Sequence, residues 1–233
     1  MKDQERLVLV TGAGRGVGAA TVKALLAMPH VTVIAVSRSL QALMDAVGPQ
    51  PRMEACTLDL GGSTAAERLA QVVGARRLHA LVHNAGHLHK ADMGMHQRAD
   101  LERVFLTNAI APLELSQALA ANLAGDPPGH IVHIGSMGGF QDSAKFPGLV
   151  AYSASKAALA CTAQCLAEEF KDRGIRSNCL ALGSVDTEML RAAFPGFRAG
   201  TTADAIGAYV AEFSLHGHNL FNGKVLPVAT TTP

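Results

Sequence analysis

Tyr152 and Lys156 are the two side chains of this sequence whose types and spacing best suit proton transfer. They open a helical pattern that continues over Ala157–Phe170, and a spacing of four residues places both on one face of a helix. A free phenol has a pKa of about 10, but a neighbouring ammonium stabilises the phenolate and brings that pKa toward neutral. The pair therefore predicts a group that exchanges a proton with a substrate oxygen. Because Tyr-x-x-x-Lys also occurs by chance, the prediction depends on its surroundings.

A glycine-rich loop at Thr11–Gly18 predicts a binding site for a dinucleotide. The loop follows a short apolar strand and precedes a helical pattern over Ala19–Met28. Its glycines allow a sharp turn and a close approach to a pyrophosphate at the positive end of that helix. They are Gly12, Gly14, Gly16 and Gly18. A purely structural turn is the alternative, and the strand–loop–helix context favours the dinucleotide.

The end of the second predicted strand favours NADP over NAD. NAD sites usually carry a carboxylate there, which binds the ribose hydroxyls, whereas this strand ends in Ser37 and Arg38. The Arg38 guanidinium is suited to a 2′-phosphate, and Arg15 in the glycine loop adds a second positive charge. The alternative is that both arginines are solvated surface residues.

Seven short apolar runs, separated by amphipathic segments of helical length, predict the elements that position these groups. Runs that are apolar on both faces indicate a parallel sheet covered on both sides. The prediction is an α/β fold with a doubly wound, Rossmann-type sheet of about seven strands, in one domain over residues 1–233. The predicted strands are Leu7–Val10, Val31–Val36, Met53–Leu58, Leu78–His83, His130–Gly135, Arg176–Leu182 and Lys224–Val228.

A long helix is predicted over about residues Gln97–Asn122, and it contains Pro112. Proline cannot donate a hydrogen bond to the carbonyl four residues earlier, which belongs to Asn108. A freed carbonyl that faces a cavity can bind a water. The kink therefore predicts either part of a proton path or a bend without a further role.

Composition and charge exclude several classes of protein. The 20 Lys and Arg residues against 19 Asp and Glu give a net charge of +1, so nucleic acid is not expected as a partner. No apolar run approaches the roughly 20 residues of a membrane span, and the polar start lacks a signal-peptide pattern. We therefore expect a cytoplasmic protein without a membrane partner.

Cysteine and histidine spacing predicts no disulfide and no metal site. The four cysteines contain no Cys-x-x-Cys pair, which favours buried thiols, and His87 with His89 supplies too few ligands for a metal. The cysteines are Cys56, Cys161, Cys165 and Cys179.

Together these motifs resemble the classical short-chain dehydrogenase/reductase family, of the NADP-preferring type, over nearly the whole chain. The glycine loop, the Tyr-x-x-x-Lys pair and the Asn-Ala-Gly run at Asn84–Gly86 are family motifs. The family's serine at the end of the fifth strand is matched by Ser136. Its asparagine in the fourth helix is matched by Asn108, and its adenine-side aspartate by Asp59.

The resemblance implies the roles of these residues in reducing a carbonyl. Tyr152 would protonate the substrate oxygen and Ser136 would hydrogen-bond it. Lys156 would bind the nicotinamide ribose and lower the pKa of the tyrosine, while Asn108 would position a relay water. The residues implied to contact NADP(H) are Gly12, Gly14, Arg15, Gly16, Val17, Gly18, Ser37, Arg38, Asp59, Leu60, Asn84, Ala85, Gly86, Tyr152, Lys156, Val185 and Thr187.

The sequence departs from the family pattern in the strands and in the loops. His83 replaces the first asparagine of Asn-Asn-Ala-Gly, which we expect to alter strand packing rather than coenzyme contact. Leu182 replaces a proline, which we expect to loosen the loop that follows it. Extra residues at Gln141–Lys145 are expected at the substrate mouth. A partly apolar lid is expected over about Glu188–Thr201, carrying Met189, Leu190, Phe194 and Phe197.

The expected substrate is a small carbonyl compound, and two alternatives stay open. One is a 3-oxoacyl group on an acyl carrier protein, although Leu119–His130 offers that acidic partner no Lys or Arg. The other is a non-catalytic NADP-binding regulatory protein, although such proteins typically lose the tyrosine or the lysine.

Two segments rich in small and apolar residues predict an assembly. Ala157–Phe170, which includes Ala163, and Leu113–Leu123 are apolar on more than one face, and the resembled family uses these helices to form dimers and tetramers. We therefore expect a homodimer or homotetramer, with packing inside one chain as the alternative.

Overall fold

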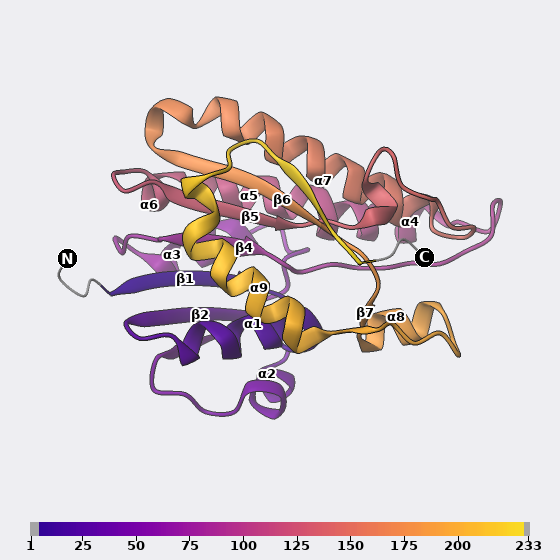
Figure 1. Ribbon diagram of the computed structural model, residues 1–233, viewed down its shortest axis with the longest axis horizontal. Coiled ribbons are helices and arrows are strands. Elements are labelled where there is room, and N and C mark those ends of the chain that lie inside the picture. Colours follow the sequence, from indigo (N-terminus) through magenta and orange to yellow (C-terminus); the bar gives the residue numbers. More distant parts are fainter. Residues whose placement is uncertain (1–4, 231–233) are drawn as a thin grey trace.

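The computed structural model describes residues 5–230, and its centre is a seven-stranded parallel sheet (Figure 1). The strand order is β3-β2-β1-β4-β5-β6-β9. The strands are β1 (Arg6–Thr11), β2 (Val31–Ser37), β3 (Met53–Thr57), β4 (Ala80–His83), β5 (Gly129–Ile134), β6 (Ile175–Leu182) and β9 (Val225–Val228). Each predicted strand is found within two residues at both ends, so the predicted doubly wound sheet is confirmed.

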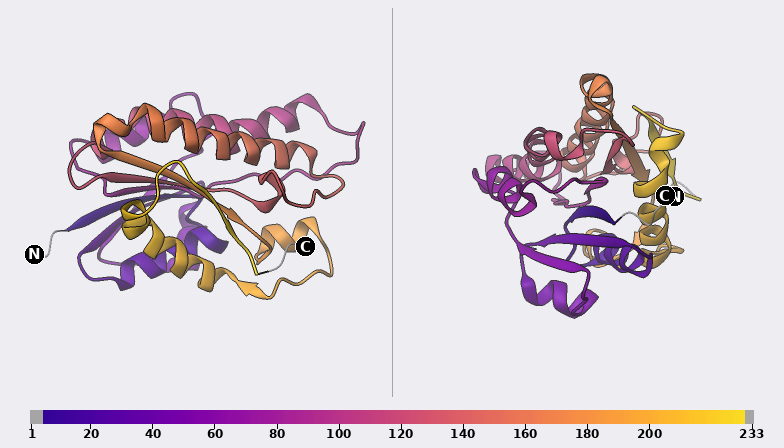
Figure 2. Two further views of the ribbon diagram at one scale, coloured as in Figure 1. Left: turned by 45° about the horizontal axis from the view of Figure 1, so that its top comes forward. Right: turned by 90° about the vertical axis from the view of Figure 1, so that its left-hand side faces the viewer.

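Helices cover both faces of the sheet (Figure 2). One face carries α1 (Gly16–Ala27), α2 (Leu40–Val47) and α9 (Ala203–His216). The other carries α3 (Ala65–Val73), α4 (Arg98–Phe105), α5 (Ala111–Ala118), α6 (Ala120–Leu123) and α7 (Val150–Glu169). Successive strand residues point to opposite faces, so Val8 and Val10 pack in one core while Leu7 and Leu9 pack in the other. This double burial explains the continuous apolar runs of the strands.

The helical segment predicted over Gln97–Asn122 is found, and it is divided into several elements. A π-helical turn, η1 (Leu106–Ile110), separates α4 from α5, and Leu119 separates α5 from α6. Pro112 lies in the first turn of α5, where a missing N–H is tolerated. Because Pro112 cannot bond back to Asn108, the α-helical ladder is interrupted there, and the π turn buries Asn108 completely.

Beyond the carboxyl ends of the strands lies a small separate layer, at the right of Figure 1. It consists of α8 (Glu188–Ala193) between β7 (Val185–Asp186) and β8 (Thr201–Thr202), which pair with each other. Thr187 caps α8, because its hydroxyl accepts a hydrogen bond from the Leu190 N–H at 3.3 Å. Short 3₁₀ turns occur at Met137–Gly139, Lys171–Arg173 and Gly217–Asn219. Over residues 5–230, each helix is either too short or too polar to cross a bilayer.

Helix α7 corrects two of the predictions. Cys161 and Cys165 lie on its exposed side, so the prediction that all four cysteines are buried is wrong for these two. Cys179 is buried and Cys56 is half-buried. Ala163, expected at an interface between chains, is 0% exposed because it faces the interior of its own chain.

Candidate active site

A cleft of about 1580 Å³ opens at the carboxyl ends of the strands, where ligands bind in open α/β sheets. Its walls are the glycine loop after β1, the ends of β2, β4 and β5, and helix α8. Every residue predicted to contact NADP(H) lines this cleft, and so does Ser136. Asn108 does not line it and lies buried beneath its floor.

The glycine loop is tied to β4 by the side chain of Asn84. Its amide Nδ2 donates hydrogen bonds to the Thr11 carbonyl at 3.0 Å and to the Gly12 carbonyl at 3.1 Å. A Cβ atom at Gly18 would overlap both the Gly12 carbonyl oxygen and the Asn84 amide, so only glycine fits there. Helix α1 begins at Gly16, earlier than its predicted start. The first N–H groups of α1 are free to donate hydrogen bonds to a pyrophosphate, and the glycines leave the space that such a group needs.

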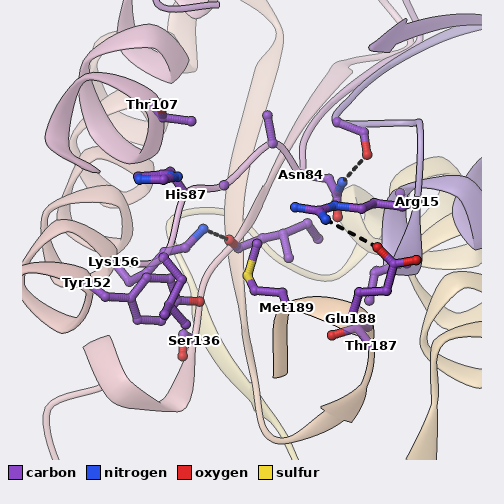
Figure 3. A pocket seen from close by; sticks show the side chains of 18 of the residues that line it. Arg15, Asn84, His87, Thr107, Ser136, Tyr152, Lys156, Thr187, Glu188 and Met189 are labelled. Atoms are coloured by element: carbon purple, nitrogen blue, oxygen red, sulfur yellow. Dashed lines mark hydrogen bonds and ion pairs between the residues drawn. The ribbon is translucent and has the colours of Figure 1, made fainter. Parts of the chain in front are cut away.

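The two arginines expected at the 2′-phosphate differ in their surroundings. Arg38 lines the cleft beside Ser37, and within the described part of the chain no carboxylate forms an ion pair with it. Arg15 instead pairs with Glu188 of α8, with 3.2 Å between Nη1 and Oε2 (Figure 3). No local sequence pattern predicts this ion pair, because 173 residues separate its partners.

Ser136, Tyr152 and Lys156 lie side by side in the cleft (Figure 3). Tyr152 is in the first turn of α7, and Lys156 follows one turn later on the same face. The Lys156 Nζ donates to the Ile134 carbonyl at 2.7 Å and lies 6.0 Å from the centre of the Tyr152 ring. Two elements bring these side chains together: Ser136 lies just after the end of β5, and Tyr152 and Lys156 lie on α7.

The pKa values of this group are set mainly by burial. Desolvation lowers the pKa of Lys156 to about 8, and desolvation raises the pKa of Tyr152, while a hydrogen bond with Ser136 acts in the opposite direction. Lys156 is not among the groups that shift the pKa of Tyr152. Its ammonium is directed at the Ile134 carbonyl and not at the phenol.

Asn108 holds the loop after β4 in place. Its side-chain Oδ1 accepts from the His87 N–H at 2.7 Å, and its Nδ2 donates to the His87 carbonyl and to the Ser155 hydroxyl, both at 2.9 Å. Both Nδ2 hydrogens are therefore engaged, and Oδ1 keeps a second lone pair. His87, considered in the sequence only as a metal ligand, lines the cleft. Its position directly after Asn84–Gly86 was the available signal.

His83 lies inside the sheet and not among the residues that line the cleft. Its Nε2 is 2.9 Å from the Ser116 hydroxyl, and its ring centre is 5.0 Å from that of His133. Burial and the positive charge of Lys156 lower the pKa of His83 to about 3, and burial likewise lowers that of His133. Both rings are therefore neutral at pH 7.

The remaining part of the cleft combines apolar side chains with polar ones such as His87 and Lys90. Met189, Leu190, Phe194 and Phe197 line it, as expected for the lid, together with Phe146 and Leu149. The segment Gln141–Lys145 does not itself line the cleft, although Phe146, which follows it directly, does. The Lys145 ammonium folds back onto the carbonyls of Phe140 and Ser143.

A search for metal ligands over residues 5–230 finds no three His, Cys, Asp or Glu side chains placed to hold an ion. His89, one of the two histidines considered, lies 3.7 Å from the Asp100 carboxylate, measured from Nε2 to Oδ2.

Comparisons with known proteins identify similar chains. The family model described as "short chain dehydrogenase" matches residues 6–196. The chain is 34% identical to carbonyl reductase [NADPH] 2 of Sus scrofa, covering 78% of this chain and 73% of that one. It is 31% identical to the rhamnolipids biosynthesis 3-oxoacyl-[acyl-carrier-protein] reductase of Pseudomonas aeruginosa, covering 80% and 75%. A solved structure, the RhlG/NADP active-site complex of the same organism, superposes with a TM-score of 0.84 at 26% identity, covering 97% and 95%.

Proposed function

The chain belongs to the short-chain dehydrogenase family, and from this premise we propose that it is an NADPH-dependent reductase of a small carbonyl compound. Members of the family are oxidoreductases that use a nicotinamide cofactor. The observation that carries the proposal is the meeting of Ser136, Tyr152 and Lys156 in the same cleft as the glycine loop. A purely regulatory NADP-binding protein has no need of this proton-transferring group.

In the proposed mechanism, Tyr152 donates its proton to the carbonyl oxygen as that oxygen gains negative charge. Ser136 donates a hydrogen bond to the same oxygen. Lys156 binds the nicotinamide ribose and places its positive charge near the phenolate that remains. The bound cofactor supplies the hydride for the carbonyl carbon. Asn108 positions a water through its main chain, so that Tyr152 is reprotonated.

The shape of the substrate half favours a compact carbonyl compound with an apolar body. Met189, Phe194 and Phe197 form one side of it, and Phe146 contacts Phe194 edge to face at 6.0 Å between ring centres. The carbonyl reductase relative supports this substrate class. The 3-oxoacyl-[acyl-carrier-protein] reductase relative favours an acyl thioester as a second candidate. Rates on a panel of ketones, aldehydes and a 3-oxoacyl thioester, followed at the nicotinamide absorbance, test the two.

We expect NADPH to bind more tightly than NADH, and Arg38→Ala to remove much of the difference. The cause is the charge-assisted contact between the Arg38 guanidinium and the 2′-phosphate, which NADH lacks. Such a contact contributes ~1.5–3 kcal/mol, so the variant should lose roughly tenfold or more in NADPH affinity and little in NADH affinity. Isothermal titration with both nucleotides measures the effect.

Arg68→Ala is the matched control for this experiment, because Arg68 is an exposed arginine on α3 that does not line the cleft. It should leave both affinities unchanged. Equal affinities of the unaltered protein for NADPH and NADH would reject the proposed coenzyme preference.

We also propose that the chain assembles as a homodimer or homotetramer through the outward side of α7 and the neighbouring η1 and α5. Ile110 and Leu113 there are each 45% exposed, and Cys161 and Cys165 are exposed beside small residues. We expect Cys161→Arg to weaken the assembly, because a charge at a packed interface is costly to desolvate. Light scattering at micromolar concentration measures the mass.

Leu40→Arg is the control, because Leu40 is 51% exposed and lies on α2, on the opposite face of the sheet from α7. It should leave the mass unchanged. A mass equal to one chain for the unaltered protein would overturn the proposed assembly.

A further inference from the structure

The ion pair between Arg15 and Glu188 joins two walls of the cleft that are far apart in the sequence. Arg15 is the N-cap residue of α1, and Glu188 is the first residue of α8. Their side chains are 57% and 67% exposed, so the pair is open to solvent and to any ligand that enters. Figure 3 shows the two side chains meeting beside Asn84, which ties the glycine loop to β4.

The surroundings of Glu188 hold α8 against the glycine loop. The Thr187 Cγ2 lies 3.3 Å from where a Cβ of Gly16 would be. The junction between β7 and α8 is therefore close to this loop. At its other end, α8 is held by Lys90, which donates to the Ala193 carbonyl at 2.9 Å and lies 4.5 Å from the centre of the Phe194 ring. The backbone of Glu188 is therefore held beside the glycine loop.

The chemistry of the glycine loop conflicts with this carboxylate. A helix N-terminus next to a guanidinium is an anion site, and arginine binds phosphate as well as carboxylate in a bidentate way. The negative charge beside Arg15 comes from Glu188. A nicotinamide dinucleotide brings its own phosphates to this loop, so Arg15 then has two competing anionic partners.

We propose that Glu188 is a positioning residue that competes with a cofactor phosphate for Arg15, and that binding of the dinucleotide exchanges the carboxylate for the phosphate. The inference rests on the proposed function only in requiring that a nicotinamide dinucleotide occupies the cleft. In consequence Glu188 lowers the affinity for the cofactor through Arg15.

The test is the affinity of Glu188→Gln for NADPH and NADH, measured by isothermal titration. Because exposed ion pairs are weak, we expect binding to tighten by about two- to fivefold. A gain in affinity is informative, since a substitution that only damages the fold weakens binding. A gain confined to NADPH assigns the exchange to the 2′-phosphate, and a gain for both nucleotides assigns it to the pyrophosphate.

The double variant Arg15→Gln/Glu188→Gln separates competition for Arg15 from direct repulsion of the cofactor. If Glu188 acts through Arg15, its substitution has no effect once Arg15 is replaced. Arg15→Gln alone should weaken binding by roughly tenfold, as loss of a charge-assisted contact does. A gain from Glu188→Gln that persists without Arg15 would overturn the exchange.

Glu168→Gln is the matched control, because Glu168 forms an exposed ion pair of the same length with Lys171, 3.2 Å, at the far end of α7. It should leave both affinities unchanged. Unaltered affinity in Glu188→Gln, or an equal gain in Glu168→Gln, would contradict the inference. Failure of the unaltered protein to bind either nucleotide would instead contradict the proposed function.

Discussion

Replacing Tyr152 with phenylalanine is expected to lower the turnover number by about 10²–10⁴-fold, with NADPH affinity nearly unchanged. Phenylalanine keeps the ring that packs in the first turn of α7 and removes only the hydroxyl. Ser136 still offers a hydrogen bond to the carbonyl oxygen, but the hydroxyl that gives its proton to that oxygen is lost. Steady-state rates on the best carbonyl substrate, together with titration of NADPH, measure the two quantities separately.

Tyr209→Phe is the control, since Tyr209 is the second of the two tyrosines in the sequence. It lies on α9, is 43% exposed and is not part of the cleft. The same substitution there should leave the rate unchanged. Retention of most activity by Tyr152→Phe would remove the phenol from the mechanism and favour a non-catalytic role for the bound dinucleotide.

The sheet could be predicted from the sequence because each of its strands carries a local signal. Strands such as Leu7–Val10 are apolar at every position, and burial on both faces of a covered parallel sheet demands this. The glycine loop is equally local, since its residues follow one another in the sequence and form one turn. The positions lining the cleft were predictable for the same reason, because parallel strands all end at the same edge.

The parts that could not be predicted depend on contacts between distant segments. The π turn around Asn108 interrupts the α-helical hydrogen bonds. Buried hydrogen bonds from the Asn108 side chain to His87 and Ser155 stabilise it. The ion pair of Arg15 with Glu188 needs α8 to fold back over the glycine loop. The residue pattern of one segment does not indicate which distant segment it contacts.

The exposure of the two thiols on α7 could not be predicted from the sequence either. A helix with small residues on several sides has the same sequence pattern whether its second face packs against its own chain or against another copy. In the structure Ala163 faces inward and Cys161 outward, which the sequence pattern alone does not separate. The same ambiguity is why the test of assembly uses Cys161 and not Ala163.

Lys156 is expected to set the alkaline limit of the reduction. Its pKa in the cofactor-free chain is about 8, because burial disfavours the ammonium. The ammonium is present below that pH and lost above it, so kcat/KM for NADPH should fall as the pH rises through about 8, since this parameter reports ionisations of the free enzyme. Its neighbours His83 and His133 stay neutral, and burial raises the pKa of Cys179 to about 11, so none of these three groups titrates near pH 8.

Two substitutions test this assignment by what they do to the pH profile. Lys156→Met removes the charge and should lower kcat/KM by at least about 10²-fold at pH 7, as loss of one electrostatic contact to the reacting group does. Lys156→Arg keeps a positive charge to far higher pH and should abolish the fall near pH 8, even at a reduced rate. Lys23→Met, at an exposed lysine of α1, should change neither the rate nor the profile. If Lys156→Arg still loses activity near pH 8, a different group controls that limit, and the ammonium then acts mainly by holding the ribose and the Ile134 carbonyl in place.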